Sequence, residues 1–362
     1  MDSTVVRTAV RTAALLIVTG LGVATSNPSA AQDRRKPRES LESLIARSKV
    51  WTPNDIPSMN LRTGPSEPGS FALGETMTCD YVDKQLSGMS PKFACRLPNG
   101  DELKVKYGGD NGEVYGEVAA SRLLWALGFG ADRMYSVRVI CRGCPAKVGG
   151  ILRNNGERII DPATVERKLG ARELTDKWGW DELDRVDPSK GGATRAERDA
   201  LKLLAVVLQH SDSKARQQRI VCLDGAESEE GRCAAPLMMV NDLGVTFGRA
   251  NAMNQQPGAS VNLADWAGLP VWKTPDACIG NLAGSWTGTL KEPVISEEGR
   301  QFLADRLVQL SDQQLRDMFE AARVNLRPRA PGQANSGFPS ADEWVNAFKQ
   351  KRTEFVERRC AA

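Results

Sequence analysis

The sequence contains a single histidine, His210, among 362 residues. This scarcity excludes metal sites built from several histidines. A Ser-His-Asp triad would also have to use this residue. Its chain neighbours Ser211 and Asp212 are poorly placed to complete one, because a triad is assembled in space rather than along the chain. We therefore expect a structural role for His210.

The sequence also has little excess of either sign of charge. The formal net charge is +3, and no block of lysine and arginine stands out beyond the short run Arg34–Lys36. A nucleic-acid-binding protein usually shows a basic patch or tail. The charge balance therefore indicates no nucleic-acid partner. Internal repeats are also absent from the sequence.

Long hydrophobic runs are missing apart from one near the N-terminus, Ala13–Ala24, which follows a basic start and precedes the small residues Ser29 and Ala31. This order is typical of a secretory signal peptide, here residues 1–31 with cleavage near Ala31. The alternative, a membrane anchor, is disfavoured because the run is short for a bilayer. A lipid anchor is unsupported, because no cysteine lies near the cleavage site. We expect an exported protein, periplasmic or extracellular, with no stable membrane span after cleavage.

Eight cysteines follow the predicted signal peptide, and an even number in an exported chain indicates disulfides. One C-x-x-C motif, Cys141–Cys144, is compatible with a redox or zinc site, but it lacks a second ligand pair and the chain has one histidine. Eight cysteines allow about 105 pairings. Local spacing, and elimination for the last pair, favour Cys79–Cys95, Cys141–Cys144, Cys222–Cys233 and Cys278–Cys360.

Composition is that of an ordinary globular protein, with 41% hydrophobic and 26% charged residues. The length suits one large domain or two lobes. Residues 32–70 are basic and then rich in proline, serine and glycine, which predicts a linker or an arm that wraps the body.

Three strands are predicted over residues 77–82, 92–97 and 102–107. The last two are joined by Asn99 and Gly100, a strong hairpin signal. In the third strand, Leu103 and Val105 share one face while Lys104 and Lys106 share the other. A helix over 113–128 and a strand over 133–141 follow. Residues 147–190 are polar, and we expect mixed loop and helix there without identifiable chemistry.

Another helix, over 195–209, begins with the capping box Thr194-x-x-Glu197 and is apolar nearly all round, so it should be buried. Asp212 follows its C-terminal end. Two short apolar runs, 220–223 and 237–240, then predict a hairpin that sets Asp212 and Asp242 at its rims. Further helices are expected at 297–310, at 312–324 and after Ser340.

The order of these segments resembles the protein-kinase-like phosphotransferases. Leu103–Lys106 is similar to the strand that carries the phosphate-binding lysine, and Glu117 to the helix glutamate that holds this lysine. The run from His210 to Lys214 is similar to a catalytic loop, and Asp242-Leu-Gly to the metal-binding D-F-G. The helix segment is especially similar to that of secretory-pathway (Golgi-type) kinases, and more loosely to HipA-like kinases. The resemblance covers roughly residues 75–250.

This resemblance implies an α+β, two-lobed, disulfide-stabilised fold. A small lobe of antiparallel sheet and one helix would span residues 71–146, and a larger, mainly helical lobe residues 147–362. It implies catalytic roles for Asp212 and Lys214 and metal binding by Asp242 and Gln217. The nucleotide would contact the residues Lys106, Glu117 and Gly88. The cofactors would be ATP and Mg²⁺ or Mn²⁺, and the acceptor a protein, a glycan or a small molecule.

The chain also departs from the family pattern. The loop before the second strand offers only Gly88, Gln217 stands where asparagine is expected, and no A-P-E segment is evident. These departures keep a secreted pseudokinase or binding module open as the alternative to an active enzyme. A third hypothesis, a hydrolase in which Asp212 and Asp242 share a metal ion, leaves Lys106 and Glu117 unexplained.

Overall fold

The computed structural model describes residues 39–227, 232–249, 259–282, 288–330 and 337–360. The predicted signal peptide, residues 1–31, and the start of the predicted arm lie outside these ranges. Residues 39–362 form one compact unit. The part of the arm that is described is not a free linker, because it buries Ile45, Val50, Ile56 and Leu61 in the main core.

The first sheet has the order β3-β2-β1-β5-β7-β6, and an additional β3–β7 pairing closes five of these strands into a barrel. The expected hairpin between the second and third strands is present. We expected an antiparallel sheet. The sheet is instead mixed, because β1 and β5 pair in parallel. A parallel pair needs a long crossover, and here β2, β3 and a helix provide it. The strand bounds are β1 Glu75–Val82, β2 Lys92–Arg96, β3 Glu102–Tyr107, β5 Arg133–Arg142, β6 Ile151–Leu152 and β7 Arg158–Arg167.

The second sheet has the order β4-β10-β9-β8. Its strands are β4 Gly130–Ala131, β8 Ala171–Thr175, β9 Gln218–Leu223 and β10 Pro236–Val240. The predicted hairpin is β9–β10, in which Val240 pairs with Gln218. This register brings the residues before β9 and those after β10 to the same end of the hairpin.

The helices predicted from the sequence are present within a few residues of their expected bounds, whereas the short helix over 263–268 lies where no helix was predicted. The helix α3 has the expected capping box between Thr194 and Glu197, and α6 and α7 begin with capping boxes as well. The bounds are α1 Leu41–Arg47, α2 Glu113–Ala126, α3 Arg195–Leu208, α4 Leu263–Gly268, α5 Glu297–Leu307, α6 Asp312–Ala321 and α7 Ala341–Val356. None of the helices in the described residues is long and apolar enough to cross a membrane.

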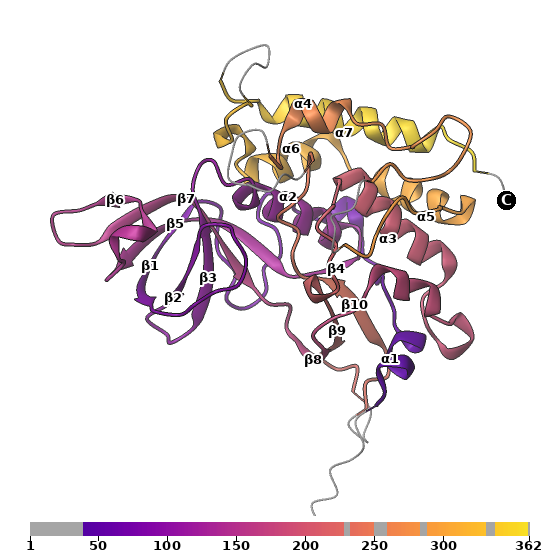
Figure 1. Ribbon diagram of the computed structural model, residues 1–362, viewed down its shortest axis with the longest axis horizontal. Coiled ribbons are helices and arrows are strands. Elements are labelled where there is room, and N and C mark those ends of the chain that lie inside the picture. The colour runs from indigo at the N-terminus through magenta and orange to yellow at the C-terminus, as the bar shows by residue number, and fades with distance from the viewer. Residues whose placement is uncertain (1–38, 228–231, 250–258, 283–287, 331–336, 361–362) are drawn as a thin grey trace, which may run out of the picture. The chain divides into compact units, whose positions relative to one another are not determined.

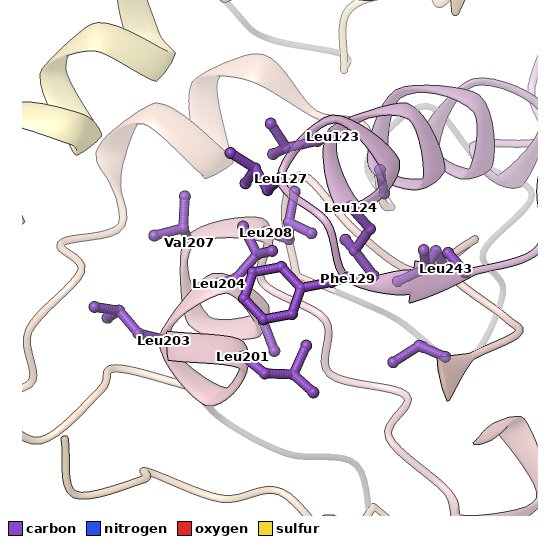
Figure 2. Close-up of a cluster of buried hydrophobic side chains, with 14 of the residues drawn as sticks. Leu123, Leu124, Leu127, Phe129, Leu201, Leu203, Leu204, Val207, Leu208 and Leu243 are labelled. Carbon is purple, nitrogen blue, oxygen red and sulfur yellow. The ribbon is translucent and has the colours of Figure 1, made fainter. Parts of the chain in front are cut away.

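The buried hydrophobic residues of this unit form three clusters. One fills the barrel, the largest joins α2 to the other helices, and a small one lies on β9 and β10. In Figure 1 the barrel strands gather on the left, α3 and α5 lie on the right, and α4, α6 and α7 run along the top. Figure 2 shows the end of α2, through Leu124 and Leu127, meeting α3 through Leu204 and Leu208. The end of α2 and the helix α3 therefore belong to the same core.

The segment 147–190 differs from the expectation of mixed loop and helix, because it contains β6, β7 and β8 with short 3₁₀ turns. Pro162 obscured β7 in the sequence, since proline is rare inside strands. It lies where the β5–β7 register shifts, between the pairs Val137–Ala163 and Val139–Ile160. The barrel therefore continues to Arg167, and a boundary at residue 146 would separate strands of one sheet.

The four disulfides are Cys79–Cys95, Cys141–Cys144, Cys222–Cys233 and Cys278–Cys360. The pairing expected from spacing and elimination is confirmed. Cys141 and Cys144 are bonded to each other, which argues against a zinc site at this motif.

Candidate functional site

Lys106 is a buried lysine at the centre of a carboxylate cluster. Alternation along β3 turns Leu103 and Val105 into the barrel core and Lys106 to the opposite face. The ammonium of Lys106 lies 2.7 Å from Glu113 Oε2, is hydrogen-bonded to Glu117 Oε1, and lies 3.6 Å from Asp242 Oδ1. Burial acts to lower the pKa of Lys106, but Asp242, Glu117 and Glu113 outweigh it and hold that pKa well above its usual value. The lysine is therefore a fixed positive charge.

The helix α2 supplies two of these carboxylates, Glu113 and Glu117. Residues four apart share one face of a helix, so both side chains point to Lys106. Glu113 was not among the residues singled out from the sequence, although its spacing from Glu117 was a usable signal. Burial raises the pKa of Glu117 to about 8. Its Oε2 atom is buried and has no hydrogen-bond partner among the residues that the structure describes.

The loop after α3 carries the second group of candidate residues. The helix ends at Leu208, and Gln209 takes a left-handed conformation that turns the chain. Asp212 Oδ1 then lies 2.7 Å from the ammonium of Lys214, and Asp212 Oδ2 accepts a 2.8 Å hydrogen bond from Gln217 Nε2. The loop is thus held by contacts within itself before β9 begins.

Asp242 follows β10 and lies between the two groups. Its Oδ1 atom faces Lys106, and its Oδ2 atom lies 3.5 Å from Gln217 Nε2. Burial acts to raise the pKa of Asp242, but Lys106 outweighs this effect and holds the pKa well below its usual value. The structure therefore brings Lys106, Glu117, Asp212 and Asp242 to one place.

Gln217 does not present an oxygen to Asp242, in contrast to its expected role as a metal ligand. Its Oε1 atom accepts a hydrogen bond from the backbone N–H of Lys214 at 3.2 Å. Turning the amide over would set its NH₂ group against that donor, so the hydrogen bonds determine its orientation. In this arrangement Gln217 is a hydrogen-bond donor that links Asp212 to Asp242.

Gly88 lies in the loop between β1 and β2, with a φ of +88° that favours glycine. A Cβ atom there would lie 2.7 Å from the ammonium nitrogen of Lys92. In the same loop, the Ser90 hydroxyl donates a hydrogen bond to Glu113 Oε1. The loop is thus tied to the carboxylate cluster through Ser90 rather than through a series of glycines.

His210 is buried beside Trp180, with ring centroids 5.9 Å apart. Neither ring nitrogen has a hydrogen-bond partner in the described part of the protein. Burial lowers the pKa of His210 to about 4, so the ring is neutral at physiological pH. This environment fits a packing role and not a catalytic triad, which needs both ring nitrogens bonded.

A cavity of about 750 Å³ is lined in part by Lys104, two residues before Lys106 on β3, and by none of the site residues described above. It lies on the Lys104 face of the barrel, where Lys104 and Glu166 form an ion pair, and it continues along the segment 168–170 after β7. We expected no identifiable chemistry in the segment 147–190, so the sequence analysis did not predict that its residues line a cavity. Its lining residues include Lys84, Leu86, Ala94, Lys104, Glu166 and Leu169.

Three carboxylates are close enough to share a metal ion. One oxygen from each of Glu113, Glu117 and Asp242 lies within 4.8 Å of the others. Carboxylate oxygens are the donors that Mg²⁺ and Mn²⁺ prefer. The donor set thus fits a hard divalent cation, with Lys106 as the competing positive charge in the same space.

Comparison with known proteins yields no matching family model and no matching curated protein. Among solved structures, the protein is similar to a Helicobacter pylori proinflammatory kinase, CtkA. The similarity covers 77% of this chain and 94% of that chain, with 9% sequence identity and a TM-score of 0.40. A likeness with a TM-score below 0.5 carries no conclusion about this chain, so the residues of the site have to be judged on their own geometry.

Proposed function

We propose that this protein is an exported, atypical kinase-like phosphotransferase that moves phosphate from ATP, with Mg²⁺ or Mn²⁺, to an unidentified acceptor. The observation that carries the proposal is the convergence of Lys106, Glu117, Asp212 and Asp242 from four separate segments. Two hydrophobic cores flank this point, as the two lobes of such an enzyme would. Phosphoryl transfer needs positioning and charge neutralisation more than covalent chemistry.

Each residue has a role that its contacts support. Lys106 would bind the phosphates of the nucleotide, while Glu117 keeps it in place. Asp242, with the α2 carboxylates, would hold the divalent metal, which supplies charge neutralisation at the phosphates. Asp212 would accept or orient the attacking hydroxyl. Lys214, 2.7 Å from Asp212, would offset charge beside it.

The base of the nucleotide would enter the cavity beside Lys104. Lys104 lines this cavity and shares a face of β3 with Lys106, and in the proposal the phosphates of a ligand there would extend toward the carboxylate cluster. Its volume lies within the range of ordinary small-molecule sites, about 300–1,000 Å³. The charged pair Lys104–Glu166 makes the wall polar, which favours contacts with the edge of a base.

A pseudokinase is the second candidate function, and one observation favours it. The Gln217 amide donates toward both aspartates, so its carbonyl is turned away from the expected metal position. Such a protein would bind the nucleotide and fail to transfer phosphate. The same amide also lies between Asp212 and Asp242, which disfavours a hydrolase in which the two aspartates share one metal ion.

Export is part of the proposal. Four disulfides are typical of proteins that fold in an oxidising compartment. They fit a periplasmic or extracellular protein, and the predicted signal peptide would provide the route.

Thermal melting of the oxidised mature protein tests the nucleotide site. We expect ATP with Mg²⁺ or Mn²⁺ to raise the melting temperature, because a ligand at 100 times its Kd stabilises by about 2.7 kcal/mol. Asp242→Asn should abolish this metal-dependent rise, whereas Asp212→Asn should keep it and lose transfer. The exposed Asp305→Asn is the matched control and should behave as wild type.

The outcomes separate the hypotheses. A rise that persists in Asp242→Asn would contradict the metal assignment. Nucleotide binding without transfer to any acceptor or to water would support the pseudokinase. No rise in wild type at millimolar nucleotide would contradict both functions.

A further inference from the structure

Lys92 is a second lysine on the same face as Lys106. It opens β2, and the β2–β3 register places Lys92 directly opposite Lys106. Directly paired residues on neighbouring antiparallel strands project to the same side of the sheet, with Cβ atoms about 5 Å apart. Lys92 therefore faces the same site as Lys106.

Two like charges in this position are unfavourable for the protein alone. Burial and the neighbouring Lys106 both lower the pKa of Lys92, while Glu113 and Asp242 act in the opposite direction. Within the described ranges, no hydrogen bond and no ion pair within 4.0 Å reaches the Lys92 ammonium. Lys106, by contrast, contacts three carboxylates. A half-buried ammonium without a close partner is suited to bind an anion.

The loop between β1 and β2 supports this assignment. Phosphate-binding loops usually present several backbone N–H groups, which closely spaced glycines make accessible. Here the loop has one glycine, and the backbone at Gly88 lies against the Lys92 ammonium. The hydroxyl of Ser90 ties the same loop to Glu113. A lysine side chain thus occupies the place where backbone donors would otherwise be needed.

We propose that Lys92 and Lys106 together form a subsite for the polyphosphate of the ligand, with Lys92 supplying the charge that the glycine-poor loop lacks. This proposal rests on the proposed function for the identity of the ligand as ATP. The subsite itself requires only a chain of linked phosphates. In the absence of such an anion, Lys92 is held near Lys106 at an electrostatic cost.

Calorimetric titration of wild type and Lys92→Met with three probes, at fixed ionic strength, tests the subsite. The probes are Mg²⁺–ATP, Mg²⁺–tripolyphosphate and adenosine. We expect Lys92→Met to weaken both phosphate probes at least about tenfold, the value of one charge-assisted hydrogen bond, and to leave adenosine unchanged. Arg96→Met removes an exposed cation from the same strand and should have no effect.

Stability gives a readout that a structural lysine would not produce. Lys92→Met removes the repulsion from Lys106, so the melting temperature of the free protein should stay the same or rise. A structural role predicts a lower melting temperature and equal losses for all probes. That result, or unchanged tripolyphosphate affinity in Lys92→Met, would overturn the proposal.

The probes also separate this proposal from the proposed function. If wild type binds tripolyphosphate in a Lys92-dependent manner but does not bind ATP, the subsite stands and the nucleotide function fails. If ATP binds but Lys92→Met leaves its affinity intact, the nucleotide function stands and the subsite fails. If neither phosphate probe binds, both are overturned.

Discussion

The ammonium of Lys106 holds its carboxylate neighbours in a defined arrangement before any ligand arrives. Removing one partner of a buried ion pair is costly, because the other charge is then left without compensation. Glu113 and Glu117 come from one helix and Asp242 from a loop that follows β10. The single lysine therefore joins three elements, and its contacts set the geometry that a metal and a phosphate group would meet.

His210 shows how a single titratable residue can set the acid limit of the fold. The ring is buried with neither nitrogen hydrogen-bonded in the described residues, and burial lowers its pKa from 6.5 to about 4. The folded state therefore binds fewer protons than the unfolded state between these values. By linkage, this contribution to stability is fully present above pH 6.5 and is lost as the pH falls through 4.

We expect His210→Leu to remove this pH dependence. At about 1.4 kcal/mol for each pKa unit between 6.5 and about 4, wild type should lose roughly 3 kcal/mol more than the variant between pH 7 and pH 4. Urea denaturation of both proteins across this range measures the difference. If the stability of wild type and of His210→Leu changed equally with pH, the pKa of His210 would not be lowered by folding.

At the scale of elements, α2 is held by hydrogen bonds from several directions. The Arg122 guanidinium donates to the carbonyls of Leu61 and Arg62, and the Thr164 hydroxyl donates to the carbonyl of Val114. The Tyr115 hydroxyl contacts a carbonyl on either side of it, and nearly every residue of the helix is buried. A helix anchored in this way keeps Glu117 beside Lys106 without help from a ligand.

Hydrogen exchange should therefore show that α2 has the same structure before and after nucleotide is added. We expect its amides to exchange slowly without nucleotide and to change little when Mg²⁺–ATP is added, because burial and hydrogen bonds limit local opening. The exposed loop around Gly88 serves as the internal comparison, where added ligand should slow exchange. Fast exchange in α2 that slows with nucleotide would instead indicate a helix that the ligand moves into place.

At the scale of the whole molecule, the four disulfides differ in the length of chain that they close. Cys278–Cys360 spans a sequence separation of 82 and ties the chain after α7 to the loop before α5. Cys141–Cys144 spans a separation of 3. In the chain-entropy model, stabilisation grows with loop length, so the first bond should contribute far more than the second.

Double alanine variants test this order. Replacing Cys278 and Cys360 should lower the unfolding free energy by about 4.5 kcal/mol, and replacing Cys141 and Cys144 should cost less than about 2 kcal/mol through the same entropy. Cys141 is fully buried, so its replacement by alanine also loses packing contacts. This loss reduces the expected difference between the two variants, so a larger loss for Cys278–Cys360 would be strong support for the chain-entropy model. Urea denaturation of the oxidised proteins gives both values, and equal losses would contradict the chain-entropy account.

Local patterns in the sequence determined much of the framework. The Asn99-Gly100 turn and the alternation in 102–107 predicted β2 and β3, and the capping box at Thr194 predicted the start of α3. The disulfide pairs followed from spacing because three of them close short loops. In each case the physical cause lies within about twenty residues, so neighbouring residues were enough.

The resemblance to protein-kinase-like phosphotransferases singled out most of the site. Lys106, Glu117, Asp212 and Asp242 each stand at a position where a strand, helix or hairpin presents the side chain. Only the tertiary structure decided which groups meet there. Glu113 joins Lys106 because α2 crosses β3, and Lys92 lies opposite Lys106 because the strands pair in one register.

Long-range packing decided the remaining features. The direction of the Gln217 amide depends on the backbone of Lys214, and the parallel β1–β5 pair depends on the crossover through α2. β7 carries a proline that hides it from sequence patterns, yet it closes the barrel and walls the cavity. The sequence by itself thus determined many of the elements and most of the residue types of the site. Which charges share a space, and which atom of each faces the ligand, was decided only when distant segments came into contact.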